Sequence, residues 1–172
     1  MANITFILGG SRSGKSTLAS NLAKKHKKVV FFATSEALDD EMKRRISLHK
    51  RRRPKNWKTI EASDNLAESI GSIRGDFDCA IIDCITLYIA NLCCKNIKAE
   101  LIEKAIKKIM VALRRSLIGE WIVVSNEVGQ GIVPVSRMGR EFRDIAGKIN
   151  QIIAKEADTV LFMIAGIPQK VK

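Results

Sequence analysis

The chain has 172 residues, of which 46% are hydrophobic and 28% charged, so its composition is that of a globular protein and excludes a disordered or fibrous one. A chain of this length suits one compact domain, which we assign to residues 1–172. The formal net charge of +12 predicts an anionic partner: a nucleotide, a phosphorylated metabolite, a nucleic acid or an acidic membrane.

The chain shows no pattern for membrane insertion or export. Its longest apolar runs, such as 29–33 and 80–82, are far shorter than the roughly 20 residues that span a bilayer. Residues 1–8 enter a strand pattern directly, without a charged leader or a cleavage site. Four cysteines lack paired CxxC spacing, and we expect reduced thiols. We therefore predict a cytoplasmic protein without a membrane span.

Apolar runs and helical patterns alternate along the chain. Runs at 4–8, 29–33, 79–82, 121–125 and 160–164 predict strands buried on both faces, and 56–62 is a weaker candidate for a short strand. Helical patterns at 17–25, 102–113 and 143–155 lie between them, with apolar residues at three- and four-residue steps. This alternation predicts an α/β fold with a mainly parallel sheet flanked by helices, in three layers.

The first strand pattern runs into a phosphate-loop motif. Eight residues match GxxxxGK[ST] between a strand and a helix: Gly9, Gly10, Ser11, Arg12, Ser13, Gly14, Lys15 and Ser16. The glycines allow a tight turn whose N–H groups converge on phosphate oxygens at a helix N-terminus. Lys15 would reach the outer phosphates, and the Ser16 hydroxyl would bind Mg²⁺. The motif predicts a nucleotide-binding domain.

The strand pattern at 79–82 ends in an acid, Asp83. A carboxylate at the carboxyl end of such a strand would lie near the metal of the phosphate loop. The alternative is an aspartate that only caps the next segment. Because the phosphate loop is present, we favour Ser16 and Asp83 as the metal site.

A basic segment at 41–58 carries nine Lys or Arg residues and one acid, so it holds +8 of the formal +12. Met42, Ile46 and His49 recur at helical spacing, so a helix begun by Asp39 or Asp40 would carry His49 on its apolar face. A neutral imidazole can attack a phosphoryl group, and neighbouring cations would attract a triphosphate. From the residues alone, a solvated basic face with an incidental histidine stays open.

Several blocks, in order along the chain, resemble one known family. They are the loop 9–16, Ala33-Thr34-Ser35, the run 38–42 leading to His49, Asp83-Cys84-Ile85-Thr86, the run 125–134, Arg140-Glu141-Phe142-Arg143-Asp144, and 165–168. The chain resembles the bifunctional adenosylcobinamide kinase/adenosylcobinamide-phosphate guanylyltransferases of cobalamin assembly. The blocks span nearly the whole chain, so the resemblance is far more specific than a phosphate loop alone.

The resemblance implies a two-step enzyme with a RecA-like P-loop fold. A kinase step with ATP or GTP would phosphorylate the aminopropanol hydroxyl of adenosylcobinamide. A guanylyltransferase step would pass GMP from GTP, through a histidine that falls on His49, to adenosylcobinamide phosphate, giving adenosylcobinamide-GDP. Lys15 and His49 are the implied catalytic residues, and a homotrimer is implied as well. The implied nucleotide contacts are 9–16 with Ala33, Thr34, Ser35, Lys50, Arg51, Arg52, Arg53, Glu61 and Asp83.

Some features depart from the family pattern. The stretch 91–103 is short where relatives often have a longer insert, 51–53 is unusually basic, and Leu48 stands where some relatives carry a second histidine. Asn126 and Glu127 follow the fourth strand pattern at the expected site edge, where Glu127 would orient an acceptor hydroxyl or serve a structural role.

Two other function classes stay open from the sequence. A P-loop kinase for another small molecule would need Lys15 and Asp83 but not His49. A basic nucleic-acid-binding module is disfavoured, because aromatic residues make up only 5% of the chain and a single-strand platform needs them. We therefore expect no nucleic-acid partner.

Overall fold

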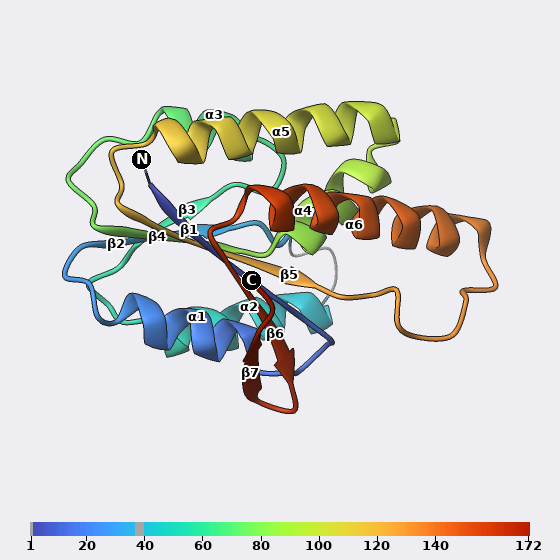
Figure 1. The fold of residues 1–172 in the computed structure, drawn as a ribbon, viewed down its shortest axis with the longest axis horizontal. Helices are drawn as coiled ribbons and strands as arrows, with labels where there is room; N and C mark the ends of the chain where they lie inside the picture. Colours follow the sequence, from blue (N-terminus) through green and yellow to red (C-terminus); the bar gives the residue numbers. More distant parts are fainter. Residues whose placement is uncertain (1, 37–39) are drawn as a thin grey trace.

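A computed structural model describes residues 2–36 and 40–172. Its centre is a seven-stranded sheet with the order β3-β2-β4-β5-β1-β6-β7 (Figure 1). The strands are β1 (Asn3–Gly9), β2 (Val29–Ala33), β3 (Lys58–Glu61), β4 (Cys79–Asp83), β5 (Glu120–Asn126), β6 (Thr159–Ile164) and β7 (Ile167–Lys170). All neighbours pair in parallel except β6 and β7, which form an antiparallel hairpin.

Helices cover both faces of this sheet, which makes three layers (Figure 1). The helices are α1 (Lys15–Ala23), α2 (Asp40–Arg52), α3 (Leu66–Gly71), α4 (Ile85–Cys94), α5 (Ala99–Arg115) and α6 (Arg137–Glu156). In the view of Figure 1, α3, α4, α5 and α6 lie above the sheet, and α1 and α2 lie below it. The three-layer arrangement predicted from the alternation of runs is confirmed.

The five strand patterns all correspond to strands, and the weak candidate at 56–62 corresponds to β3. The basic segment forms α2, whose first described residue is Asp40, while Asp39 lies outside the described residues. Three elements had no counterpart in the sequence prediction: α3, α4 and β7. The short stretch 91–103 contains the end of α4 and the start of α5, joined by a turn at 95–98.

The core has one part on each face of the sheet. The larger part packs apolar residues of α3, α4, α5 and α6 onto one face, where Trp121 of β5 stacks on Phe32 of β2 with ring centroids 5.7 Å apart. The smaller part packs Ala19 and Ala23 of α1 onto the other face. Because both faces are covered, β2 is buried at every position, which explains its unbroken apolar run VVFFA.

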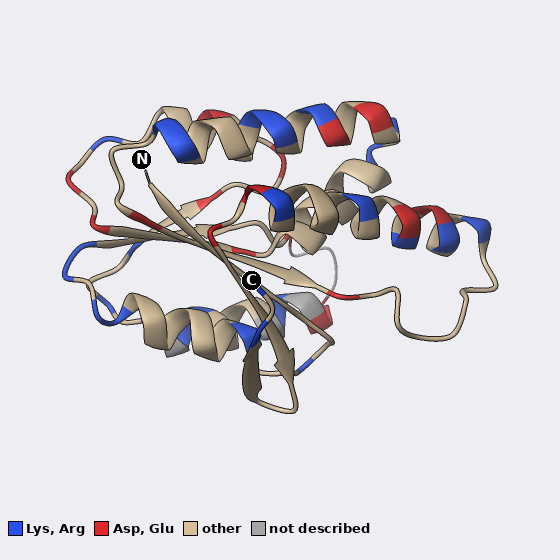
Figure 2. Cartoon of the chain, in the orientation of Figure 1, with Lys and Arg blue, Asp and Glu red and all other residues tan. Residues whose placement is uncertain are grey.

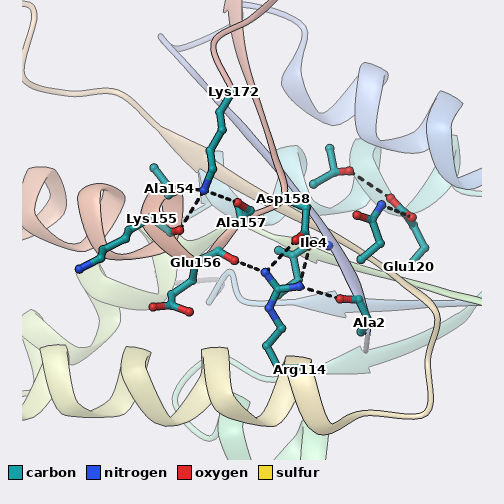
Figure 3. A network of polar contacts seen from close by, with 12 residues as sticks. Ala2, Ile4, Arg114, Glu120, Ala154, Lys155, Glu156, Ala157, Asp158 and Lys172 are labelled. Carbon is teal, nitrogen blue, oxygen red and sulfur yellow. Dashed lines mark hydrogen bonds and ion pairs between the residues drawn. The ribbon is translucent and has the colours of Figure 1, made fainter.

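A polar network holds the amino ends of the strands (Figure 3). The Arg114 guanidinium at the end of α5 donates to the Asp158 carboxylate at 2.7 and 3.1 Å and to the Ala2 carbonyl at 2.8 Å. Asp158 also accepts from the Ile4 N–H at 2.7 Å. The Lys172 ammonium donates to carbonyls at the end of α6, including that of Ala157 at 2.6 Å. These bonds join α5, α6 and β1 at the amino ends of the strands, the edge of the sheet opposite the phosphate loop.

Charges of both signs alternate along the outer surfaces of α5 and α6 (Figure 2), as solvated faces of such helices require. The excess positive charge is instead concentrated in the segment 41–58. Among the described residues, no helix combines the length and the apolar character needed to cross a bilayer.

Candidate active site

The site lies where β4, β5 and β1 end side by side. The carboxyl end of β5 sits between the other two, because Asn126 pairs with Gly9 of β1 and Val124 pairs with Asp83 of β4. Parallel strands bring their carboxyl ends to one edge, and loops at that edge form the crevice in which α/β proteins bind ligands. The sheet therefore gathers three of the predicted blocks at one place.

The phosphate loop leaves β1 through a turn that only glycine fits. A Cβ on Gly9 would lie 2.7 Å from the carbonyl oxygen of Met163 and 2.9 Å from Ser13 Oγ, and Gly14 has φ +96°. The Ser13 N–H donates to the Gly10 carbonyl at 3.3 Å, while the Gly166 N–H of the β6–β7 turn donates to the Ser13 carbonyl at 3.0 Å. The loop thus leads directly into α1 in the arrangement that cradles phosphates.

The Lys15 side chain is folded back onto this loop. Its ammonium donates to the Gly10 carbonyl at 2.6 Å and, more weakly, to Ser13 Oγ at 3.5 Å. Burial lowers the pKa of Lys15, and the nearby Cys84 and Asp83 act against this by favouring the charged form. A phosphate at the loop would supply a stronger partner for this buried ammonium.

Asp83 ends β4 next to the start of α1. Burial raises the pKa of this carboxyl, and a hydrogen bond with Ser16 together with the charges of His49, Arg53 and Lys15 opposes the rise. A carboxylate and a hydroxyl are both hard oxygen ligands of the kind that Mg²⁺ prefers. The pair of Ser16 and Asp83 therefore fits the predicted metal site in its chemistry.

His49 lies near the end of α2 and lines the same cavity as the phosphate loop. This cavity has a volume of about 550 Å³, and its wall includes Lys15, Ser16, His49, Arg53 and Asp83. Ile46, one turn before His49, also faces it. The side chain of Met42, the other member of that predicted apolar face, lies outside the described residues. A histidine side chain and a phosphate-binding turn thus border one space.

Arg53 also lines the cavity. Its guanidinium carbon lies 3.7 Å from the centroid of the Phe31 ring. Its Nη1 is buried without a hydrogen-bond partner among the described residues. Burial lowers the pKa of Arg53, against the influence of Asp83 and Glu61. A buried donor without an acceptor costs free energy, and an anionic ligand in the cavity would satisfy it.

The structure places some of the predicted nucleotide contacts away from this cavity. Lys50 donates to Glu61 Oε1 at 2.6 Å on the outside of α2, and Arg51 lines a second, shallow depression there with Lys43 and Ser47. Thr34 is fully buried, and its hydroxyl exchanges hydrogen bonds with the backbone N–H and C=O of Cys84, each at 2.7 Å.

Of the remaining predicted contacts, Ser35 lines the cavity, whereas the buried Ala33 and Gly9 and the partly exposed Gly10 do not. The Arg52 side chain lies outside the described residues. Glu127 does not line the cavity; its carboxylate accepts from the Gly129 N–H at 2.6 Å, which is a structural contact.

Several lining residues were not among the predicted contacts. Cys84 and Leu87 come from the start of α4, Leu48 and Ile46 from α2, and Val124 from β5. Burial raises the pKa of the Cys84 thiol to about 12, so it lines the site as a neutral group. The resemblance block that begins at Asp83 was the available signal for Cys84, whereas Leu87 depends on a helix that had not been predicted.

Comparisons with known proteins show the family of this chain. Residues 5–171 match the family described as cobinamide kinase / cobinamide phosphate guanyltransferase. Similar proteins include the bifunctional adenosylcobalamin biosynthesis proteins CobP of Pseudomonas aeruginosa, 39% identical, and CobU of Salmonella typhimurium, 38% identical. CobU of Escherichia coli is 36% identical. Each match covers 96% of this chain and at least 95% of the relative.

Solved structures support the fold alone. A type III secretion ATPase of pathogenic bacteria superposes with a TM-score of 0.59 at 11% identity, and EscN of enteropathogenic E. coli with 0.54 at 12%. Each match covers 98% of this chain, which spans about half the length of those ATPases. The predicted P-loop α/β class is confirmed.

Proposed function

The chain belongs to the cobinamide kinase / cobinamide phosphate guanyltransferase family, and from that premise we propose how the cavity at the phosphate loop carries out two transfers. It is an adenosylcobinamide kinase and adenosylcobinamide-phosphate guanylyltransferase of cobalamin biosynthesis. ATP or GTP as phosphoryl donor, the guanylyl-histidine intermediate and the residue roles below are our proposals.

In the kinase step, the loop 9–16 binds the phosphates of ATP or GTP. The Lys15 ammonium leaves the Gly10 carbonyl and contacts the outer phosphates, since a phosphoryl oxygen is the stronger acceptor. The aminopropanol hydroxyl of adenosylcobinamide attacks the γ-phosphorus, the bond to the β-phosphate oxygen breaks, and the hydroxyl proton is lost to solvent. Mg²⁺, held by Ser16 and Asp83, would offset the charge of the phosphates.

In the guanylyltransferase step, a neutral His49 nitrogen attacks the α-phosphorus of GTP and pyrophosphate leaves. A phosphate oxygen of adenosylcobinamide phosphate then attacks the same phosphorus, the P–N bond breaks, and adenosylcobinamide-GDP is released with His49 restored. Arg53 lines the cavity with His49 and has a buried Nη1 without a partner among the described residues, and it stabilises the negatively charged phosphoryl oxygens during both displacements.

The observation that carries this proposal is the shared cavity. His49 of α2 and Gly14, Lys15 and Ser16 of the phosphate loop line one space of about 550 Å³ in a single subunit. A nucleotide bound at the loop therefore lies in the space that the imidazole borders. A kinase for another small molecule would have no use for a histidine at this place.

Incubation with α-³²P-labelled GTP tests the histidine role. We expect the wild-type protein to acquire a label that is stable in base and labile in acid, and that adenosylcobinamide phosphate removes. His49→Ala should abolish the label and retain γ-phosphate transfer to adenosylcobinamide. His26→Ala is the matched control, because the chain's other histidine lies in the turn after α1, away from the cavity, and its loss should leave labelling intact.

Two results would contradict the proposal in different ways. A label that persists in His49→Ala would place the nucleophile elsewhere. A wild-type protein that phosphorylates adenosylcobinamide but never takes up α-label would be a kinase without the histidine step.

The assembly and the compartment are also proposed. The resemblance implies a homotrimer, and the loop between β5 and α6 (residues 127–136) supports a subunit contact, because Ile132 and Val135 are each 98% exposed. We place the enzyme in the cytoplasm, where its four free cysteines would stay reduced.

A further inference from the structure

Asn126 stands at a position in the site to which the proposed mechanism gives no role. It ends β5, the strand between the phosphate-loop strand and the Asp83 strand, and it lines the cavity. Its side-chain amide has only a weak contact among the described residues, from Nδ2 to the Cys84 sulfur at 4.0 Å. The amide is therefore a donor group available to a ligand.

The backbone of Asn126 is held from both sides by buried polar side chains. Its N–H donates to Thr86 Oγ1 at 2.6 Å, and its carbonyl accepts from Asn150 Nδ2 at 3.1 Å. Thr86 Oγ1 is in turn 2.9 Å from Ser125 Oγ. Thr86, Ser125 and Asn150 are each exposed by 5% or less. A residue whose N–H and C=O are both fixed has a fixed Cα–Cβ direction, which limits the positions that its side-chain amide can reach.

This arrangement leaves a buried polar atom without a partner, which packing alone would not require. Asn150 Nδ2 donates to the Asn126 carbonyl, and Asn150 Oδ1 is buried without a partner among the described residues. Buried polar groups without a partner are destabilising, and they concentrate where function requires them. Three elements, α4, β5 and α6, contribute to holding one residue in place.

The place of Asn126 indicates which part of a nucleotide it meets. It pairs with Gly9, where the loop begins, and the next N–H, that of Glu127, donates to the Gly9 carbonyl at 2.9 Å. The Lys15 ammonium lies at Gly10, next along the loop, and the P-loop lysine reaches the β- and γ-phosphates. A donor between Gly9 and Asp83 therefore faces the terminal phosphate rather than the sugar or the base.

We propose that Asn126 donates a hydrogen bond to the γ-phosphate of the bound nucleoside triphosphate, and that Thr86, Ser125 and Asn150 are positioning residues for it. The inference rests on the proposed function, since it requires a nucleotide at the loop 9–16. It makes the site discriminate a triphosphate from a diphosphate before any transfer occurs.

Equilibrium binding of two matched analogues tests this proposal. In α,β-methylene GTP and α,β-methylene GDP, the bond that His49 would cleave is blocked, and the pair differs only in the γ-phosphate. We expect Asn126→Ala to weaken the triphosphate analogue about tenfold, as loss of a hydrogen bond to a charged group does, and the diphosphate analogue by less than about twofold. Asn126→Asp should weaken the triphosphate more, because two anions would face each other.

The positioning residues and a control complete the experiment. Asn150→Leu should also weaken binding of the triphosphate analogue more than that of the diphosphate analogue, but only about threefold. Its thermal unfolding midpoint shows whether the variant folds. Asn21 is an exposed asparagine of α1 outside the cavity, so Asn21→Ala should leave the dissociation constants of both analogues unchanged.

If Asn126→Ala weakened the binding of both analogues equally, Asn126 would have a structural role. If it left both dissociation constants unchanged, Asn126 would not contact the nucleotide. Either result overturns the inference. A wild-type protein that binds neither analogue would overturn the proposed function and this inference with it.

Discussion

Asp83 is a residue whose requirements for stability and for function conflict. Its carboxyl is buried, and burial raises its pKa against the pull of Ser16, His49 and Arg53. A raised pKa means that the ionised form is less favourable in the folded protein than in the unfolded chain. The negative charge that a bound Mg²⁺ would need is therefore destabilising in the nucleotide-free protein.

We predict that Asp83→Asn stabilises the nucleotide-free protein while abolishing magnesium-dependent nucleotide binding. The gain in the free energy of unfolding should be about 1 kcal/mol at pH values above the folded pKa of Asp83. For a chain of this length that is a rise of about 2–4 °C in Tm. Below about pH 4 the carboxyl is protonated in both states, so the variant and the wild type should unfold alike. Differential scanning calorimetry across this pH range measures the effect, and a Tm lowered at neutral pH would contradict it.

At the scale of residues, the sequence predicted the chemistry of the site better than its lining. Lys15, Ser16 and Asp83 were identified because each belongs to a motif or a patterned segment, whereas the role of His49 came from the family resemblance. All four border one cavity. Thr34 and Glu61 lie in segments that the resemblance marked, yet one bonds to the Cys84 backbone and the other to Lys50. A motif places a backbone segment near a site, whereas the direction of each side chain depends on contacts distant in sequence.

Among the elements, α5 and β6 depend on one network for their relative position. Arg114 and Asp158 form a two-contact pair with side chains 26% and 42% exposed, and Asp158 also binds the Ile4 N–H. The hydrogen bond from Arg114 is the main reason that the pKa of Asp158 is lowered. Since this carboxyl ionises more readily in the folded protein, the network stabilises the fold when the pH is above the unfolded pKa of Asp158.

We predict that Asp158→Asn lowers the free energy of unfolding by about 1 kcal/mol at pH 7, a figure that allows for the exposure of the pair. The difference from the wild type should decrease as the pH falls from about 4 through the lowered folded pKa, because the native carboxyl then loses its charge. Urea unfolding at pH 7 and pH 3 measures it. Asp76→Asn is the control, since the Lys28–Asp76 pair is largely exposed and its loss should not change the unfolding midpoint.

The elements that the sequence did not predict share physical causes. In α4 the run ITLYIANLCC is buried at six positions, and its less buried positions are Leu, Ala and Cys, so it has no polar face and no helical period to detect. In β7 all four residues are exposed and one is Pro168, and the strand exists only because the turn after β6 brings it into antiparallel pairing. Strongly amphipathic α5, by contrast, was recognisable from its own residues.

On the scale of the whole molecule, the net positive charge and the most exposed apolar loop lie in different segments. The segment 41–58 holds most of the net positive charge at one side of the cavity, whereas the exposed apolar residues Ile132 and Val135 lie in the 127–136 loop. The first feature suits an anionic substrate, and the second suits contact with another subunit. The alternation of elements predicted the three layers, but the order of strands depends on pairings between residues distant in sequence and could not be read from local patterns.

We predict that the wild-type protein has three times the 19.1 kDa chain mass in light scattering, and that Ile132→Asp combined with Val135→Asp reduces it to that of one chain. Charges introduced into a buried apolar contact carry a large desolvation cost. Leu117→Asp is the matched control, because Leu117 is equally exposed but precedes β5 at the opposite edge, and its replacement should leave the mass unchanged. A wild-type mass of one chain would contradict the trimer.

The contact between the Gly166 N–H and the Ser13 carbonyl joins the first loop of the chain to its last turn. The ribosome makes Ser13 long before Gly166, and the strand that supports this turn, β6, is made only shortly before it. A nascent chain that stops before residue 159 therefore contains all residues of the phosphate-loop motif but lacks the turn whose N–H bonds to the loop. The phosphate loop is therefore completed only after residue 166 has been made, long after its own residues.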